Sequence, residues 1–285
     1  MAIKSVWLGL NFEEPPLDHT EETHASETYA LELCAREGAH LSVCLAAPIF
    51  TVPSVVPGAG LLAIENTPAD EVNADRRVRA EAAHVRIASQ VKRAGLSAEF
   101  HVIQVSYAQL RNRLVASAMP SDLAVLSRSG YYLSLDRGMI EAMLFTSGRP
   151  IVLVPPGWER EARIAKIIIA WDGGGRAARA VGDAMPLLTH AEEVEIVCVS
   201  RATSKFTPSE DLAAHLARHC KKVIVTDLPM KDGGIAVTLR AHAVAWRADL
   251  LVMGAYAHPR MLEILVGGVT NDMFSEAEIP VLLSH

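Results

Sequence analysis

Residues 249–254 read Asp-Leu-Leu-Val-Met-Gly: an acidic residue, four consecutive apolar residues and a glycine. A short, continuous apolar run of this kind is typical of a parallel strand whose two faces are both covered by helices. A similar run, Asp-Leu-Ala-Val-Leu, occupies residues 122–126, which lie 127 positions earlier. The presence of one buried-strand pattern in each half of the chain indicates a duplicated domain.

Strand-like and helix-like segments alternate on both sides of these runs. This βαβ order predicts an α/β fold with doubly wound, open parallel sheets and right-handed crossovers. The expected strands are 6–10, 41–45, 98–105, 123–126 and 151–154 in the first half, and 166–171, 194–200, 222–226, 250–253 and 280–283 in the second. The expected helices are 27–36, 74–94, 107–118, 137–145, 176–188, 209–219, 235–247 and 260–275.

Other landmarks repeat with a different spacing. Pro150-Ile-Val-Leu matches Pro280-Val-Leu-Leu 130 positions later, whereas Cys44 in Ser-Val-Cys-Leu matches Cys198 in Ile-Val-Cys-Val 154 positions later. The first half is therefore longer between its second and fourth strands, and we assign the extra length to an insert at 48–71. Pro155-Pro156-Gly157 stops a strand, which predicts domains at 1–157 and 158–285. The apolar stretch 52–63 of the insert is a lid, an interface or a packed loop.

Composition excludes several classes of protein. Half of the 285 residues are hydrophobic, and the net charge of −6 comes without a run of Lys or Arg, so we expect no nucleic-acid partner. The four cysteines form no CxxC pair, which predicts reduced thiols and no zinc site. The apolar start at 6–10 is too short for a signal peptide, and no run is long enough for a membrane helix. We therefore expect a cytoplasmic protein.

Two segments of the second half follow strands and are rich in glycine. They are Ala170-Trp-Asp-Gly-Gly-Gly175 and Met253-Gly-Ala-Tyr-Ala-His258, and the latter precedes Gly267-Gly-Val-Thr270. Ligands of open parallel sheets bind beyond the carboxyl ends of the strands. Exposed backbone N–H groups and a following helix N-terminus favour an anion there. The alternative is that these glycines only make turns.

The spacing of the second segment resembles the universal stress protein family, whose ATP-binding members carry Gly-x2-Gly-x9-Gly-(Ser/Thr). Gly254, Ala257, Gly267 and Gly268 occupy the four positions, with Ala257 in place of glycine and Gly268 in place of Ser/Thr. The resemblance covers the second half nearly end to end, and the first half in its organisation. It implies two five-stranded sheets of order 3-2-1-4-5, of the adenine nucleotide alpha hydrolase-like type. Strands 151–154 and 280–283 would then be edges that pack together, making an intramolecular pseudo-dimer, with a homodimer as a further option.

The resemblance also implies a stress-response protein that binds ATP, with a divalent cation such as Mg²⁺, in the C-terminal half alone. Asp172 would hold the nucleoside. The remaining roles fall to three groups: a base pocket of Ala170, Trp171 and Val199, a border to the ribose and phosphates of Met253, Gly254 and Tyr256, and a phosphate cradle of Gly267, Gly268, Val269 and Thr270. The first half lacks the acidic residue, since its first strand ends in Asn11-Phe12-Glu13, and it lacks most of the glycines.

The sequence offers three alternatives to an ATP site: an oxidoreductase, a metal site and a scaffold. Gly173-x-Gly175-x-x-Ala178 matches a dinucleotide fingerprint and would suit an NADP-dependent oxidoreductase, but it leaves the later glycines unexplained. His215 and His219 lack the glutamate of HExxH, so we expect no metal site. No general base stands out beside the glycines, which predicts regulation and at most slow ATP hydrolysis. A scaffold that holds no nucleotide remains the competing function.

Overall fold

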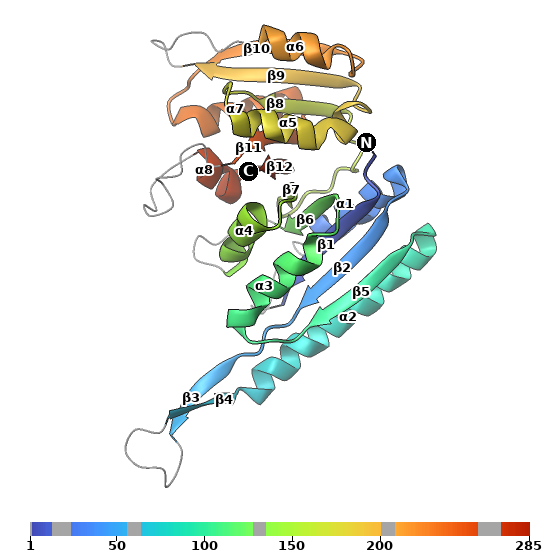
Figure 1. The fold of residues 1–285 in the computed structure, drawn as a ribbon, viewed down its shortest axis with the longest axis vertical. Coiled ribbons are helices and arrows are strands. Elements are labelled where there is room, and N and C mark those ends of the chain that lie inside the picture. The colour runs from blue at the N-terminus through green and yellow to red at the C-terminus, as the bar shows by residue number, and fades with distance from the viewer. Residues whose placement is uncertain (1, 13–23, 56–63, 128–134, 201–208, 256–268) are drawn as a thin grey trace.

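The computed structural model describes residues 2–12, 24–55, 64–127, 135–200, 209–255 and 269–285. Figure 1 shows one long twisted sheet with helices on both faces. The strands are β1 (Ser5–Asn11), β2 (His40–Ala46), β3 (Thr51–Val55), β4 (Ile64–Pro68), β5 (Ala98–Ile103), β6 (Leu123–Ser127), β7 (Ile151–Val154), β8 (Lys166–Ala170), β9 (Glu193–Ser200), β10 (Val223–Pro229), β11 (Leu250–Gly254) and β12 (Val281–Ser284). The helices are α1 (His24–Glu37), α2 (Asp70–Ala94), α3 (Tyr107–Ala118), α4 (Leu135–Thr146), α5 (Gly175–Leu188), α6 (Glu210–Leu216), α7 (Gly234–Trp246) and α8 (Val269–Glu276).

The main sheet has ten strands in the order β10-β9-β8-β11-β12-β7-β6-β1-β2-β5. Within each half this order reads 3-2-1-4-5, and all pairs within a half are parallel. The α/β fold class predicted from the sequence is confirmed.

The two halves join through one antiparallel pair. Val281 of β12 faces Leu153 of β7, and Leu283 faces Ile151. The prediction that segments 151–154 and 280–283 pack together is confirmed, and the contact is direct strand pairing. Two sheets that would each expose an apolar edge strand thereby become a single sheet without that edge.

The two faces of the sheet bury separate clusters. Along β1, Val6 and Leu8 point to the face covered by α1 and α2, whereas Trp7 points to the face covered by α3 and α4. The same alternation holds along β11, where Val252 is fully buried on one face and Met253 lies on the other. This double coverage explains why the strands are continuous apolar runs. No described helix is both long and apolar enough to span a membrane.

The repeated aspartate of the sequence has a structural role in both halves. Asp249 accepts hydrogen bonds from the two backbone N–H groups at the start of β8, at 2.9 and 2.8 Å. Asp122 does the same at the start of β1, at 2.7 and 3.0 Å. Each carboxylate thus ties the fourth strand of its half to the first.

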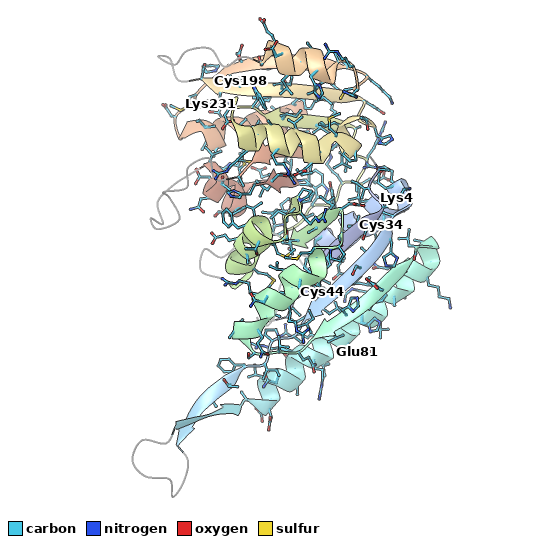
Figure 2. The ribbon with its side chains drawn as sticks, in the orientation of Figure 1. Lys4, Cys34, Cys44, Glu81, Cys198 and Lys231 are labelled. Carbon is cyan, nitrogen blue, oxygen red and sulfur yellow. The ribbon has the colours of Figure 1, made fainter. Side chains whose placement is uncertain are left out.

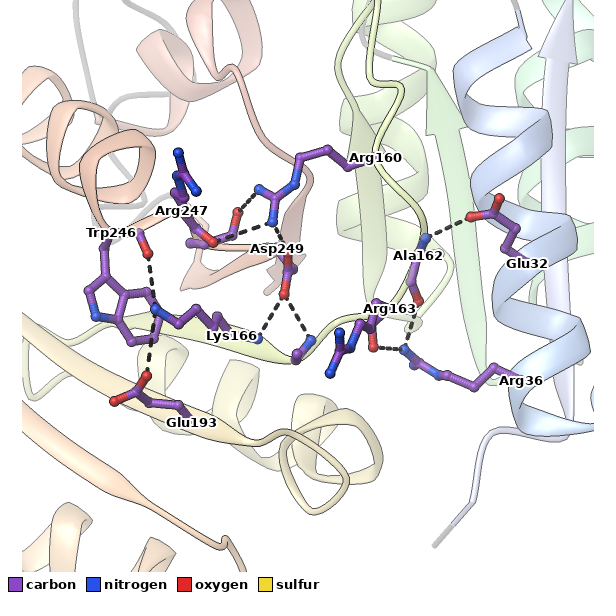
Figure 3. A network of polar contacts seen from close by, with 12 residues as sticks. Glu32, Arg36, Arg160, Ala162, Arg163, Lys166, Glu193, Trp246, Arg247 and Asp249 are labelled. Carbon is purple, nitrogen blue, oxygen red and sulfur yellow. Dashed lines mark hydrogen bonds and ion pairs between the residues drawn. The ribbon is translucent and has the colours of Figure 1, made fainter.

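The segment between β7 and β8 is held by both halves, as Figure 3 shows. Arg36 of α1 donates to the carbonyl oxygens of Ala162 and Arg163 at 2.7 and 2.6 Å. Glu32 accepts the N–H of Ala162 at 2.6 Å. On the other side Arg160 pairs with the carboxylate of Asp249. These contacts fix the connection between the halves beside the β7–β12 junction.

The predicted insert at 48–71 contains a hairpin that the sequence analysis did not identify. Strands β3 and β4 pair antiparallel, with Val52 opposite Thr67. The hairpin projects from the first half, at the end of the molecule away from the second half (Figure 1), so it does not cover the C-terminal crevice. Its apolar tip, 56–63, lies outside the described residues. Two hydrogen bonds between Phe50 and Asn73, at 2.7 and 2.9 Å, hold its base against α2.

Candidate functional site

The two glycine-rich segments of the second half flank the switch point of its sheet. From β8 the chain crosses to β9 and β10 on one side, and later returns to β11 and β12 on the other. β8 and β11 are neighbours, and Val252 is paired with Ile169 near their carboxyl ends. The crevice of an open α/β sheet forms at this point.

Asp172 lies just beyond the end of β8 and is exposed. Its Oδ1 accepts the N–H of Gly174 at 2.8 Å, across Gly173, whose φ of +75° suits only glycine without strain. This turn fixes the position of the carboxylate at the carboxyl edge of the sheet. A carboxylate has about four acceptor sites, so it can still bind a hydroxyl or an N–H group of a ligand.

The N-terminus of α5 follows directly and has free donors. Its N-cap residue, Gly174, provides no side-chain hydrogen bond, and the first turn contains no acidic residue. The Nη1 atom of Arg176, in this first turn, is buried and has no hydrogen-bond partner among the residues that the structure describes. A buried charged donor without a partner is costly. An anion at the N-terminus of α5 would accept from the open N–H groups, and Arg176 in the same turn adds a positive charge.

Gly254 brings β11 into close contact with the same turn. A Cβ atom added to Gly254 would lie 2.6 Å from the backbone nitrogen of Ala177 and 2.6 Å from the carbonyl carbon of Arg176. Both atoms belong to the backbone and cannot move aside. Close packing of helix and strand is therefore a sufficient reason for glycine at this position, separate from any contact with a phosphate.

The other predicted site residues fall on both faces of the sheet. Ala170, Val199 and Val269 pack against the cluster that contains Met253, beside α7 and α8. Thr270 is buried in the first turn of α8. Trp171 instead packs against the opposite cluster, so the structure brings together Ala170 and Val199 but not the third expected residue of the base pocket. Tyr256, Ala257, Gly267 and Gly268 lie outside the described residues.

Three other side chains of the second half that the sequence analysis considered for chemistry are Cys198 of β9, His215 of α6 and His219. Burial raises the pKa of the Cys198 thiol, and the charge of Asp227 adds to the increase. The thiol is therefore protonated at neutral pH. The ring of His215 on α6 is tilted against that of His219, just beyond the helix, with ring centroids 5.1 Å apart. Among the described residues, no group of three or more His, Cys, Asp or Glu side chains is placed to hold a metal ion.

The corresponding edge of the first half is occupied by arginines from α2. Arg79 donates to the carbonyl oxygen of Phe12, beyond the end of β1, at 3.1 Å. Arg76 is buried and donates to the carbonyl oxygen of Pro48 at 2.8 Å. Sequence reasoning noted the missing acidic residue after β1 but not these arginines. The sequence hints at the buried position of Arg76 only through its spacing, because it lies four residues before Ala80 on the same face of the helix.

Residues 164–285 match the model of the universal stress protein family. This half of the chain is a universal stress protein domain. The whole chain has the same architecture as solved structures of similar length. Its alignment with a universal stress protein from Archaeoglobus fulgidus DSM 4304 covers 98% of this chain and 95% of that protein, with a TM-score of 0.72 and 14% identity.

A functionally unknown protein from Pseudomonas aeruginosa PAO1 is also similar, with a TM-score of 0.58 and 15% identity over 99% of this chain and 92% of that protein. At such identities the likeness concerns the fold, which extends over both halves. No curated protein sequence matches the chain. The match to the family model thus lies in the second half of the chain, and the likeness in fold covers both halves.

Proposed function

We propose that the C-terminal half binds ATP at the carboxyl edge of β8 and β11, and that binding regulates a stress response rather than supporting efficient turnover. The observation that carries the proposal is the turn after β8, where the exposed carboxylate of Asp172 precedes the open N-terminus of α5. The first turn of this helix also contains Arg176, whose buried guanidinium nitrogen has no partner among the described residues. One cationic and one anionic group at a switch point suit a ligand with phosphates at one end and hydroxyls at the other.

Each described residue has a distinct role in this proposal. The Asp172 carboxylate accepts hydrogen bonds from the nucleoside. Ala170 and Val199 offer an apolar surface to the base, because they pack on the same face of the sheet. The first turn of α5 and Arg176 meet the phosphates, together with the glycines at 267–268 and Thr270. A bound Mg²⁺ would neutralise phosphate charge, and the residues described here supply no cluster of ligands of their own.

The proposal accounts for the difference between the halves. In the first half, Asn11 ends β1 and Phe12 follows it, whereas Trp171 and Asp172 follow β8. The neighbouring guanidinium groups of Arg76 and Arg79 already donate to backbone carbonyls. A nucleotide would lose the carboxylate contact there and would have to displace these hydrogen bonds. We therefore assign the site to the C-terminal half alone.

Calorimetric titration with ATP and Mg²⁺ tests the assignment. The variants Asp172→Ala and Arg176→Gln each remove one hydrogen bond to a charged group, worth about 1.5–3 kcal/mol, or roughly tenfold to a hundredfold in affinity. Gly268→Val should weaken binding by a similar factor, because its side chain fills the cradle. Gly138→Val, at the first-half position that corresponds to Gly268, should leave the affinity unchanged.

The outcomes separate the competing functions. Wild-type affinity in the Asp172 and Arg176 variants, with their circular dichroism unchanged, would show that the nucleotide lies elsewhere. The absence of heat with the wild-type protein would favour the scaffold. Tighter binding of NADPH than of ATP would favour the oxidoreductase reading, in which Gly175 opens the helix of a dinucleotide fingerprint.

A further inference from the structure

Helix α2 lies at the outer border of the molecule, along the edge strand β5 (Figure 1). Its inner face is buried against the sheet through five residues at helical spacing. These are Arg76, Ala80, Ala83, Ile87 and Val91. In the part of the chain that the structure describes, no helix or strand covers its opposite face.

That opposite face carries an unusual pattern. Val78 and Val85 are 65% and 64% exposed, the highest values among the exposed large hydrophobic residues of the described chain. They are seven residues apart, so they lie in one line along the helix. The same seven-residue step leads from Val78 back to Glu71 and from Val85 on to Lys92, both exposed. The outer line therefore reads Glu71, Val78, Val85, Lys92.

This line is complementary to itself when read in reverse. If a second copy of α2 lies antiparallel, with a two-fold axis midway between Val78 and Val85, each Val78 meets the partner's Val85. Each Glu71 then meets the partner's Lys92. Within the described residues neither Glu71 nor Lys92 makes an ion pair with its own chain, so both are available. Small residues beside the line, Ala74 and Ala82, allow the helices to approach closely.

We propose that a second copy of this chain binds here, through an antiparallel α2–α2 contact with two-fold symmetry. The charge pattern favours a second copy over an unrelated partner, because an isologous interface must complement itself. The seam runs from Glu71 to Lys92, or about 32 Å of helix, which is a small interface and gives a weak, concentration-dependent dimer. Glu81, on the outer side of α2 in Figure 2, lies next to the axis and meets its own copy. This like-charge contact weakens the dimer further.

Sedimentation velocity of the full chain over a concentration series tests the charge pattern. Glu71→Lys and Lys92→Glu each place like charges opposite each other twice per dimer, and each should raise the dissociation constant at least fivefold. The double variant Glu71→Lys/Lys92→Glu exchanges the charges and should restore the wild-type value. Glu81→Gln should tighten the dimer. A wild-type protein that stays monomeric at all concentrations, or a double variant as weak as the single ones, would overturn the proposal.

Disulfide crosslinking tests the register. The four natural cysteines are all buried, so a cysteine on α2 is the only accessible thiol among the described residues. A mixture of Val78→Cys and Val85→Cys proteins should form crosslinked dimers at least fivefold faster than either variant alone. Val72→Cys, 42% exposed but on a different side of the helix, is the matched control and should crosslink slowly with both. Equal rates for all pairs would contradict the antiparallel register, whatever the oligomeric state.

Discussion

The contact between Gly254 and α5 makes a sharp prediction about stability. In Gly254→Ala the new methyl group would lie 2.6 Å from two backbone atoms of the first turn of α5. Neither atom belongs to a side chain that can rotate away, so β11 or the whole turn must shift. Inserting a methyl group into a packed interior typically costs about 1–3 kcal/mol. We expect a loss in this range.

Urea denaturation followed by circular dichroism measures the effect. The matched control is Gly182→Ala, at an exposed position inside α5 where an added Cβ meets nothing within 4 Å. That change should stabilise the protein by about 0.5–1 kcal/mol, because alanine is the better helix former. If Gly254→Ala were as stable as the wild type, β11 and α5 would not be in contact as described, and the geometry of the proposed site would be wrong.

Three further predictions concern buried polar groups and thiols. Glu195 is buried in β9 and accepts hydrogen bonds from His242 at 2.9 Å and from Thr226 at 2.5 Å, so Glu195→Ala leaves both donors without a partner. In urea denaturation it should lower the free energy of unfolding by about 3–5 kcal/mol, and Glu195→Gln by less, whereas a loss below about 1 kcal/mol in Glu195→Ala would refute the pairing. Asp249→Ala removes two backbone hydrogen bonds and the ion pair with Arg160, so it should lower the free energy of unfolding by about 2–4 kcal/mol. Asp122→Ala removes only the backbone hydrogen bonds and should lower it by less, so equal losses would argue against the contact with Arg160. Burial raises the pKa of the Cys34 and Cys44 thiols to about 12, so a thiol reagent should titrate no cysteine of the native protein at pH 8 and all four in guanidinium; fast labelling of the native protein would contradict this burial.

The fold could be predicted from the sequence because its signals are local and repeated. Continuous apolar runs such as 250–253 identify strands covered on both faces, and the crossover rule then leaves few topologies. An aspartate occurs at both 122 and 249 because each carboxylate accepts backbone N–H groups at the start of the first strand of its half. The joining of the two sheets into one followed from the apolar edges that each half would otherwise expose.

The parts that the sequence did not reveal depend on contacts between distant segments. The hairpin of β3 and β4 was missed because a segment rich in Pro and Gly carries little strand propensity. The arginines of α2 at the edge of the first half are ordinary helix residues in the sequence, and only the fold brings them to the end of β1. Similarly, Trp171 follows Ala170 directly, and the alternation of side chains along the strand sends the two to opposite faces.

The number of ATP molecules bound per chain tests the central claim most directly. Equilibrium dialysis of the full-length protein with labelled ATP and Mg²⁺, at concentrations well above the dissociation constant, measures this number without any variant. We expect one nucleotide per chain, because one half has Asp172 and the open turn of α5, while arginines occupy the edge of the other. Two nucleotides per chain would show that the first half also binds, and none would show that the C-terminal crevice is not an ATP site.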